Sequence, residues 1–254
     1  MLVWRGSIIA AVVLIGGAFM LTRTGSDTGQ VANANNVSIW AYGAPATFSI
    51  NTDKNHAIQI AAQGRVTDAG LRHAFSNVVP SSLAGTSDWV AKAQIVNKQS
   101  DVSIRSNLVG IGAKLPAPFG KATTDAMPLL IEKKPISETQ DAIKVTLGNA
   151  IGAKFIRISQ NGISKIDRGD IGINVAPELS NQKGVSIHAN LDNLDIDEWL
   201  EQLDQSSNNN TSSAIAINSI DLTTNHLDLF DRRLNSLKIN AKSADNAWIM
   251  NIKS

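Results

Sequence analysis

The chain has no cysteine, little net charge and few aromatic residues. Without cysteine it cannot form a disulfide framework, a cysteine-ligated zinc site or a thiol nucleophile. Only 18% of its 254 residues are charged, and the formal net charge is +1. No basic block marks a surface for nucleic acid, so we expect no nucleic-acid partner.

Motifs that carry catalysis are also missing. The four histidines (His56, His73, His188 and His226) show no pair at i, i+2 or i, i+4, the spacing of a metal site. The serines lie in no G-x-S-x-G elbow. Gly110-Ile-Gly112 lacks the third glycine and the strand–helix context of a nucleotide loop. We therefore expect a protein that is not an enzyme and that has no cofactor and no metal.

What the sequence does contain is alternation of apolar and polar residues with period two, typical of strands with one apolar and one wet face. It recurs in residues 58–60, 102–105, 185–192, 237–242 and 248–253. Such strands favour a mainly β fold built from antiparallel sheets. From Ile215-Ile217 to Ile220-Leu222 the apolar phase slips by one residue, which indicates a bulge or a change of strand.

One short helix is predicted near residues 195–203. Asp195 can cap its N-terminus, with Glu198 as the capping-box partner three residues on. The residues at i, i+3, i+4 and i+7 are apolar: Ile196, Trp199, Leu200 and Leu203. The nearby acidic residues Asp192 and Asp197 are then part of a helix start rather than of a metal or acid–base site.

The N-terminus is the most apolar part of the chain, since residues 7–21 carry no charge. We interpret residues 1–24 as a candidate transmembrane anchor. A signal peptide and buried strands are the alternatives. Residues 25–36 are small and polar and are predicted to be a linker. A boundary near 133–138 then divides the rest into a β module over 37–134 and a second over 135–254.

Several longer motifs resemble those of the YhdP family, which is AsmA-like. The most specific is residues 101–121, with Ser106-Asn107-Leu108, Gly110 and the run Leu115-Pro-Ala-Pro-Phe119 followed by Lys121. Further matches in order are 83–89 (LAGTSDW), 126–129 (AMPL), 166–169 (IDRG), 191–200 (LDNLDIDEWL), 230–237 and 247–248. The likeness covers residues 37–254, and family members are longer, so it implies an interior segment of such a protein.

The resemblance implies curled open sheets that form an AsmA-like β groove. It also implies a protein anchored in the bacterial inner membrane, with its folded part in the periplasm. Its partners would be phospholipid, the membrane and other envelope proteins, and it would carry phospholipid towards the outer membrane along an apolar β groove. Five residues at inward strand phases are the candidate groove positions: Ile187, Ala189, Ile239, Met250 and Ile252. The alternatives are a non-catalytic envelope domain that binds carbohydrate or protein, and a fragment with no activity of its own.

Overall fold

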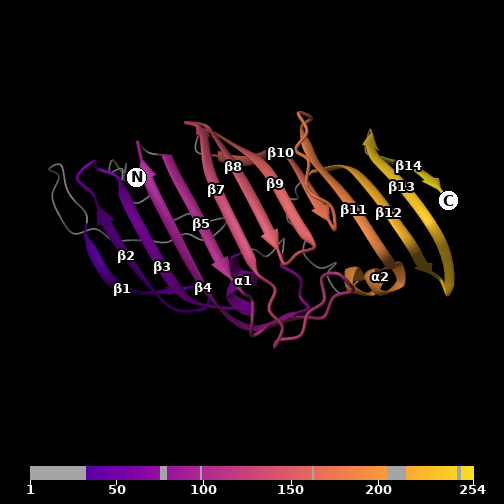
Figure 1. The fold of residues 1–254 in the computed structure, drawn as a ribbon, viewed down its shortest axis with the longest axis horizontal. Coiled ribbons are helices and arrows are strands. Elements are labelled where there is room, and N and C mark those ends of the chain that lie inside the picture. Colours follow the sequence, from indigo (N-terminus) through magenta and orange to yellow (C-terminus); the bar gives the residue numbers. More distant parts are fainter. Residues whose placement is uncertain (1–32, 75–78, 98, 162, 205–215, 245–246) are drawn as a thin grey trace, which may run out of the picture.

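The computed structural model describes residues 33–74, 79–97, 99–161, 163–204, 216–244 and 247–254, with the side chains of residues 201–204 left out. Its main feature is one sheet of 14 strands in which sequence neighbours mostly lie side by side. Figure 1 shows the strands following one another from β1, in indigo, to β14, in yellow. Among the described residues no pairing joins β1 to β14, so the sheet is open, as the sequence predicts.

Most strands are long, and many are joined by short turns. They are β1 (Ala34–Ala41), β2 (Ala44–Thr52), β3 (Ile58–Thr67), β4 (Leu83–Val96), β5 (Gln99–Ser106), β6 (Ile111–Ala113), β7 (Leu129–Ser137), β8 (Gln140–Leu147), β9 (Ile151–Gln160), β10 (Ile163–Ile173), β11 (Gly184–Asp195), β12 (Ile217–Leu229), β13 (Arg232–Ala244) and β14 (Ala247–Lys253). The two described helices are α1 (Asp68–Ala74) and α2 (Ile196–Asp204). A mainly β fold is confirmed.

The sheet is not antiparallel throughout, and here the prediction from sequence is wrong in part. Strand β10 pairs with β11 in parallel, and β11 pairs with β12 in parallel. A parallel pair needs a crossover connection instead of a hairpin turn. Residues 174–183 provide the first crossover, and the second begins with α2.

Two local predictions are confirmed. The slip of apolar phase near Ile217 is a bulge, because Val185 pairs with Ile217 while Ser186 pairs with Ser219. Helix α2 begins where expected, and the backbone N–H of Glu198 donates to Oδ1 of Asp195 at 3.0 Å, as an N-cap requires.

The predicted segment boundaries have different outcomes. Residues 1–32, which hold the candidate anchor and most of the predicted linker, lie outside the described residues. The linker was predicted to run to residue 36, but β1 already begins at Ala34. The predicted module boundary between residues 134 and 135 falls inside β7, and the sheet continues across it. No helix within the described ranges is long and apolar enough to cross a membrane.

The best-packed part of the molecule lies over β1 to β4. Its buried residues are Ala41, Ala46, Val66, Trp89, Ala91 and Ile111. Leu71 of α1 and Leu108 of the segment after β5 pack against this cluster. The Tyr42 ring meets Trp89 edge-on, with centroids 5.7 Å apart. Helix α1 and residues 107–128 therefore cover one face of the sheet at this end.

Residues 107–128 form a long connection between β5 and β7, and Lys121 fixes its shape. The Lys121 ammonium donates to the carbonyl oxygens of Leu108, Ile111 and Ala122 at 2.9, 2.6 and 2.9 Å. Burial lowers the pKa of Lys121 from its ordinary value, although Asp125 nearby opposes the shift. The side chain thus binds three parts of one loop together.

We expect Lys121→Met to lower the free energy of unfolding by about 2 kcal/mol, because three carbonyl groups lose a charged donor. Lys114 is exposed in the same connection, so Lys114→Met is the matched control and should change stability by less than about 0.5 kcal/mol. Urea denaturation of both variants measures the difference. Equal midpoints would show that the three contacts contribute nothing.

Candidate functional site

An uninterrupted row of apolar residues crosses the sheet from edge to edge. Strand partners face the same side of a sheet, so pairing can be followed from one strand to the next. From β1 to β14, without β6, the partners are Val37, Phe48, Ala62, Ala91, Ile104, Ile131, Val145, Ala153, Ile171, Ile187, Ile220, Ala241 and Met250. We call these residues the central row and their side of the sheet the apolar face.

A second row runs beside it, two residues away along each strand. From β7 to β14 its members are Leu129, Leu147, Ile151, Ile173, Ala189, Leu222, Ile239 and Ile252. All five candidate groove residues lie in these two rows. Ile187 and Met250 belong to the central row, and Ala189, Ile239 and Ile252 to the second row. Their contact with lipid stays a prediction.

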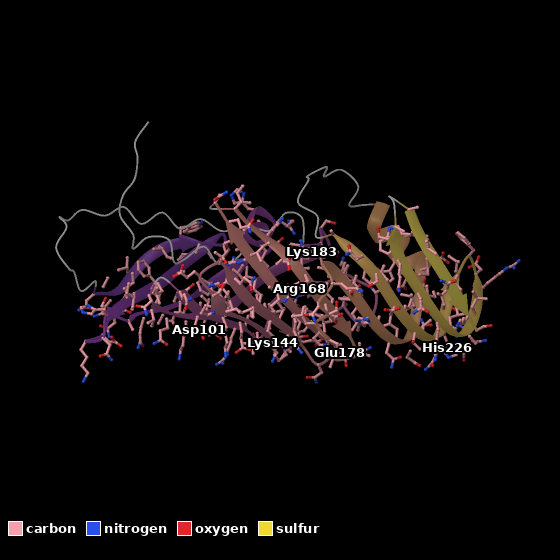
Figure 2. The ribbon with its side chains drawn as sticks, turned by 90° about the horizontal axis from the view of Figure 1, so that it is seen from above. Asp101, Lys144, Arg168, Glu178, Lys183 and His226 are labelled. Carbon is pink, nitrogen blue, oxygen red and sulfur yellow. The ribbon has the colours of Figure 1, made fainter. Side chains whose placement is uncertain are left out.

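The opposite face of the sheet is polar. One residue along from the central row, the partners from β2 to β10 are Ser49, Ala61, Lys92, Ser103, Glu132, Lys144, Lys154 and Asp170. Figure 2, seen from above, shows Asp101 and Lys144 on the same side of the sheet. A one-residue step thus separates the apolar face from a polar one.

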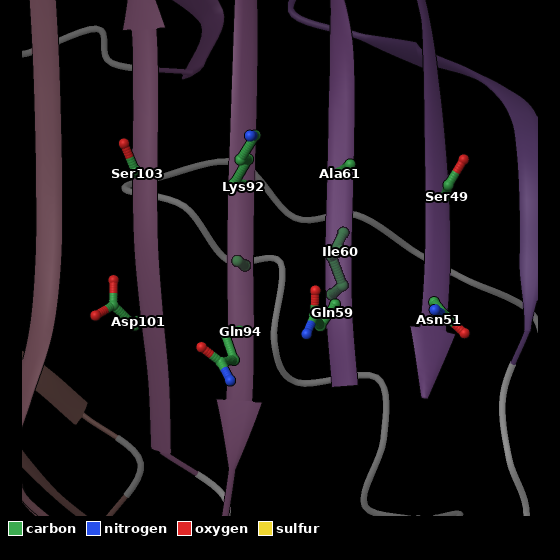
Figure 3. A pocket seen from close by; sticks show the side chains of 10 residues that line it. Ser49, Asn51, Gln59, Ile60, Ala61, Lys92, Gln94, Asp101 and Ser103 are labelled. Carbon is green, nitrogen blue, oxygen red and sulfur yellow. The ribbon is translucent and has the colours of Figure 1, made fainter. Parts of the chain in front are cut away.

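A hollow of about 580 Å³ lies over β2 to β5, and side chains of the polar face make up most of its lining. Figure 3 shows its polar side chains, which include Asn51, Gln59, Lys92, Gln94 and Asp101. The five candidate groove residues lie on other strands and on the opposite face. None of the five candidate groove residues lines this hollow.

The apolar face is covered over β1 to β4, and its apolar side chains are exposed on the edge strand β14. Ala91 of the central row is 6% exposed beneath α1 and residues 107–128. Met250 in the same row is 56% exposed, and Ile252 in the second row is 59% exposed. Large apolar side chains that are exposed next to one another are typical of a binding surface.

Several of the motifs that resemble the YhdP family lie along one rim of the sheet, whereas residues 166–169 and 247–248 lie away from it. Strand directions place α1, residues 107–128 and α2 at the same strand ends, which we call the lower rim (Figure 1). The ring of Phe119 meets the ring of Trp199 edge-on at 5.5 Å, so the LPAPF motif contacts the LDIDEWL motif. The LPAPF motif forms a turn, which is closed by a hydrogen bond from the Phe119 N–H to the Pro116 carbonyl at 3.0 Å.

Two motif glycines meet at this rim. Gly85 and Gly110 have φ angles of +114° and +96°, and Thr86 N–H donates to the Gly110 carbonyl at 3.1 Å. A Cβ on Gly85 would lie 2.1 Å from the Gly110 oxygen, and a Cβ on Gly110 would lie 2.1 Å from the Thr86 oxygen. Only glycine fits at either position. The distant motifs LAGTSDW and SNLVGIG are therefore parts of one structure.

A charged cluster interrupts the apolar face near the opposite strand ends, the upper rim. Lys133 pairs with Val102 and Ile143, so it faces the apolar side. Its Nζ lies 3.0 Å from Oδ1 of Asp141, and Arg157 Nη2 lies 2.6 Å from Oδ2. Sequence reasoning missed this cluster, because its members lie on three strands and only the register brings them together.

A second polar group was also missed. His188 lies between two carboxylates, with Nδ1 2.7 Å from Asp170 and Nε2 3.2 Å from Asp221. Asp170 is 1% exposed and accepts a hydrogen bond from the Glu178 backbone, which ties the first crossover to the sheet. The parallel pairing of β10, β11 and β12 assembles this group, and that pairing was not predicted.

Several other charged side chains have partners typical of a structural role. A hydrogen bond from Arg72 lowers the pKa of Asp68, and one from Arg233 lowers the pKa of Asp228. Asp192, Asp195 and Asp197 bind Asn225, the α2 N-terminus and the Phe230 N–H, respectively. Within the described ranges, no group of three or more His, Asp or Glu residues is placed to hold a metal ion.

Together these features define a class of protein: an open β-sheet with a continuous row of apolar residues on one face and polar residues on the other. The chain belongs to the YhdP family, because the family model described as YhdP protein matches residues 28–254. This is a family of bacterial envelope proteins. No curated protein and no solved structure matches the chain.

Proposed function

We propose that this chain is a lipid-conducting segment of a bacterial envelope protein, and that the apolar face carries phospholipid acyl chains between the inner and outer membranes. The observation that supports this most directly is the central row, which is apolar on every strand that it crosses. Acyl chains need a dry surface without interruption, since each step onto a polar group costs free energy. The mechanism needs no catalytic residue and no cofactor.

Membership of the YhdP family supports the same function, since the family is one of envelope proteins related to lipid transport. We propose that the folded part lies in the periplasm and that the envelope membranes are its partners. An envelope domain that binds carbohydrate is the weaker candidate. Such domains stack sugars on clustered aromatic rings. In this chain Tyr42 and Trp89 pack on each other in the core. The exposed rings of Trp40, Phe230 and Trp248 lie on β1, after β12 and on β14 rather than in one cluster.

Photo-crosslinking in cells tests the proposal. A photoreactive residue at Ile187, Ala189, Ile239, Met250 or Ile252 should capture phospholipid, because all five lie on the apolar face. Exposed positions 240 and 251 are one residue away on the polar face and serve as controls. We expect at least about tenfold more captured phospholipid on the apolar side, which corresponds to 1.4 kcal/mol.

Equal capture on both faces would contradict a groove on the apolar side. Failure of all five positions in cells where the protein is active would also contradict it. Capture of peptides or glycans instead of lipid would favour a binding domain.

A further inference from the structure

From the charged cluster at the upper rim we propose a further site, which rests on the proposed function. We infer that the cluster binds the head group of an anionic phospholipid through Arg157, with Lys133 and Asp141 as positioning residues, and that the acyl chains lie on the apolar rows. The inference starts from an anomaly in the sheet. A third row, on the other side of the central row, is apolar except at one position: Ile50, Ile60, Ala93, Val102, Lys133, Ile143, Phe155, Gly169 and Val185.

A lone lysine in such a row costs free energy unless its charge is compensated. The Lys133 ammonium donates to the carbonyl and hydroxyl oxygens of Ser100, both at 2.8 Å, and pairs with Asp141. Its three protons are therefore in use. Lys133 thus holds the Asp141 carboxylate in place, and its positive charge adds to the net charge of the cluster.

Arg157 is the member with donors to spare. Its Nε and Nη2 both donate to the same oxygen of Asp141, at 3.1 and 2.6 Å. Nη1 makes no hydrogen bond with the part of the chain that the structure describes. The side chain is 23% exposed, against 15% for Lys133 and for Asp141. A ligand at the rim would meet this guanidinium edge first.

The charges select the ligand. Two cations and one carboxylate leave a net charge of +1 beside an apolar surface. That combination complements a molecule with acyl chains and one negative charge. Both oxygens of Asp141 are already engaged, so the cluster offers little to the ammonium group of a zwitterionic lipid. Arginine also suits phosphate particularly well, since its planar fork donates in pairs.

The position along the strands fits an amphiphile. From the second row through the central and third rows to Asp141 there are three two-residue steps, about 20 Å at the rise of a β-strand. At the lower rim, on the side away from Asp141, Phe119 and Trp199 form an apolar contact. The head group would thus lie at the charged upper rim, with acyl chains on the rows below it.

The test uses the full 254-residue chain and vesicles of equal parts phosphatidylglycerol and phosphatidylethanolamine. After incubation the protein is re-isolated and its bound lipids are measured by mass spectrometry. Arg157→Gln should lower the ratio of bound phosphatidylglycerol to phosphatidylethanolamine about fivefold, since one charge-assisted contact is lost. Asp141→Asn should raise the ratio, because the cluster charge becomes +2.

The matched control is Lys154→Gln, which removes one positive charge from the same strand on the polar face, and it should leave the ratio unchanged. A purely structural cluster would move both variants in the same direction, with a lower melting temperature, and would overturn the inference. So would equal binding of the two lipids by the unchanged chain. Absence of any bound lipid would instead contradict the proposed function itself.

Discussion

Ala91→Asp should unfold the chain at temperatures where Ile252→Asp leaves it folded, although both changes place a carboxylate on the apolar face. Ala91 is 6% exposed and packs in the core cluster, so its new charge would be buried without a partner. Such a substitution lowers the free energy of unfolding by about 3 kcal/mol or more. Ile252 is 59% exposed, and there the change should cost less than about 0.5 kcal/mol.

Thermal denaturation followed by circular dichroism gives both values. Ala84→Asp is the control for the first variant, because Ala84 lies on β4 as well but is exposed. It should melt within a few degrees of the unchanged chain. If Ile252→Asp proved as destabilising as Ala91→Asp, the apolar face at β14 would be a sealed core and not a surface open to lipid.

The sequence predicts the faces of this sheet better than its connections. Alternation assigns Ile187, Ile239 and Ile252 to inward phases, and the register keeps them on one side, since a strand's side-chain period is two. The same alternation fits parallel and antiparallel partners alike. The parallel pairs of β11 were therefore missed, because residues 174–183 carry no helical pattern that would mark a crossover.

The module boundary shows another limit. The Lys133-Lys-Pro135 sequence resembles a linker, yet it lies in β7. Pairing of β7 with β5 ends at Lys133, so Pro135 lies where the strand has a partner on one side only. A proline is tolerated there. Likewise, the group formed by His188, Asp170 and Asp221 depends on register across three strands, which no sequence spacing reveals.

The helix was predictable because its signals are local. Asp195 and Glu198 are three residues apart, so the hydrogen bond between them needs no residue from another part of the sheet. Its partner was not predictable. The contact between Trp199 and Phe119 joins residues 80 positions apart, and only the course of the lower rim brings them together.

Val145→Asp should interrupt lipid movement along the sheet, whereas Thr146→Asp should not. The two residues are neighbours on β8, nearly equal in size and partly buried, but Val145 lies in the central row and Thr146 faces the polar side. A carboxylate at 145 puts a charge into the dry path of the acyl chains, which they cross only at a cost of several kcal/mol. The same group at 146 meets water.

The measurement places a photoreactive residue at Ile131 or at Ile187, on either side of β8 in the central row. In Val145→Asp the ratio of lipid captured at the two positions should change about tenfold or more, because lipid collects on the supply side and is depleted beyond the block. The position with more lipid then gives the direction of flow. An unchanged ratio, with the variant folded and both positions labelled, would mean that lipid binds each part of the face independently and does not travel along the row.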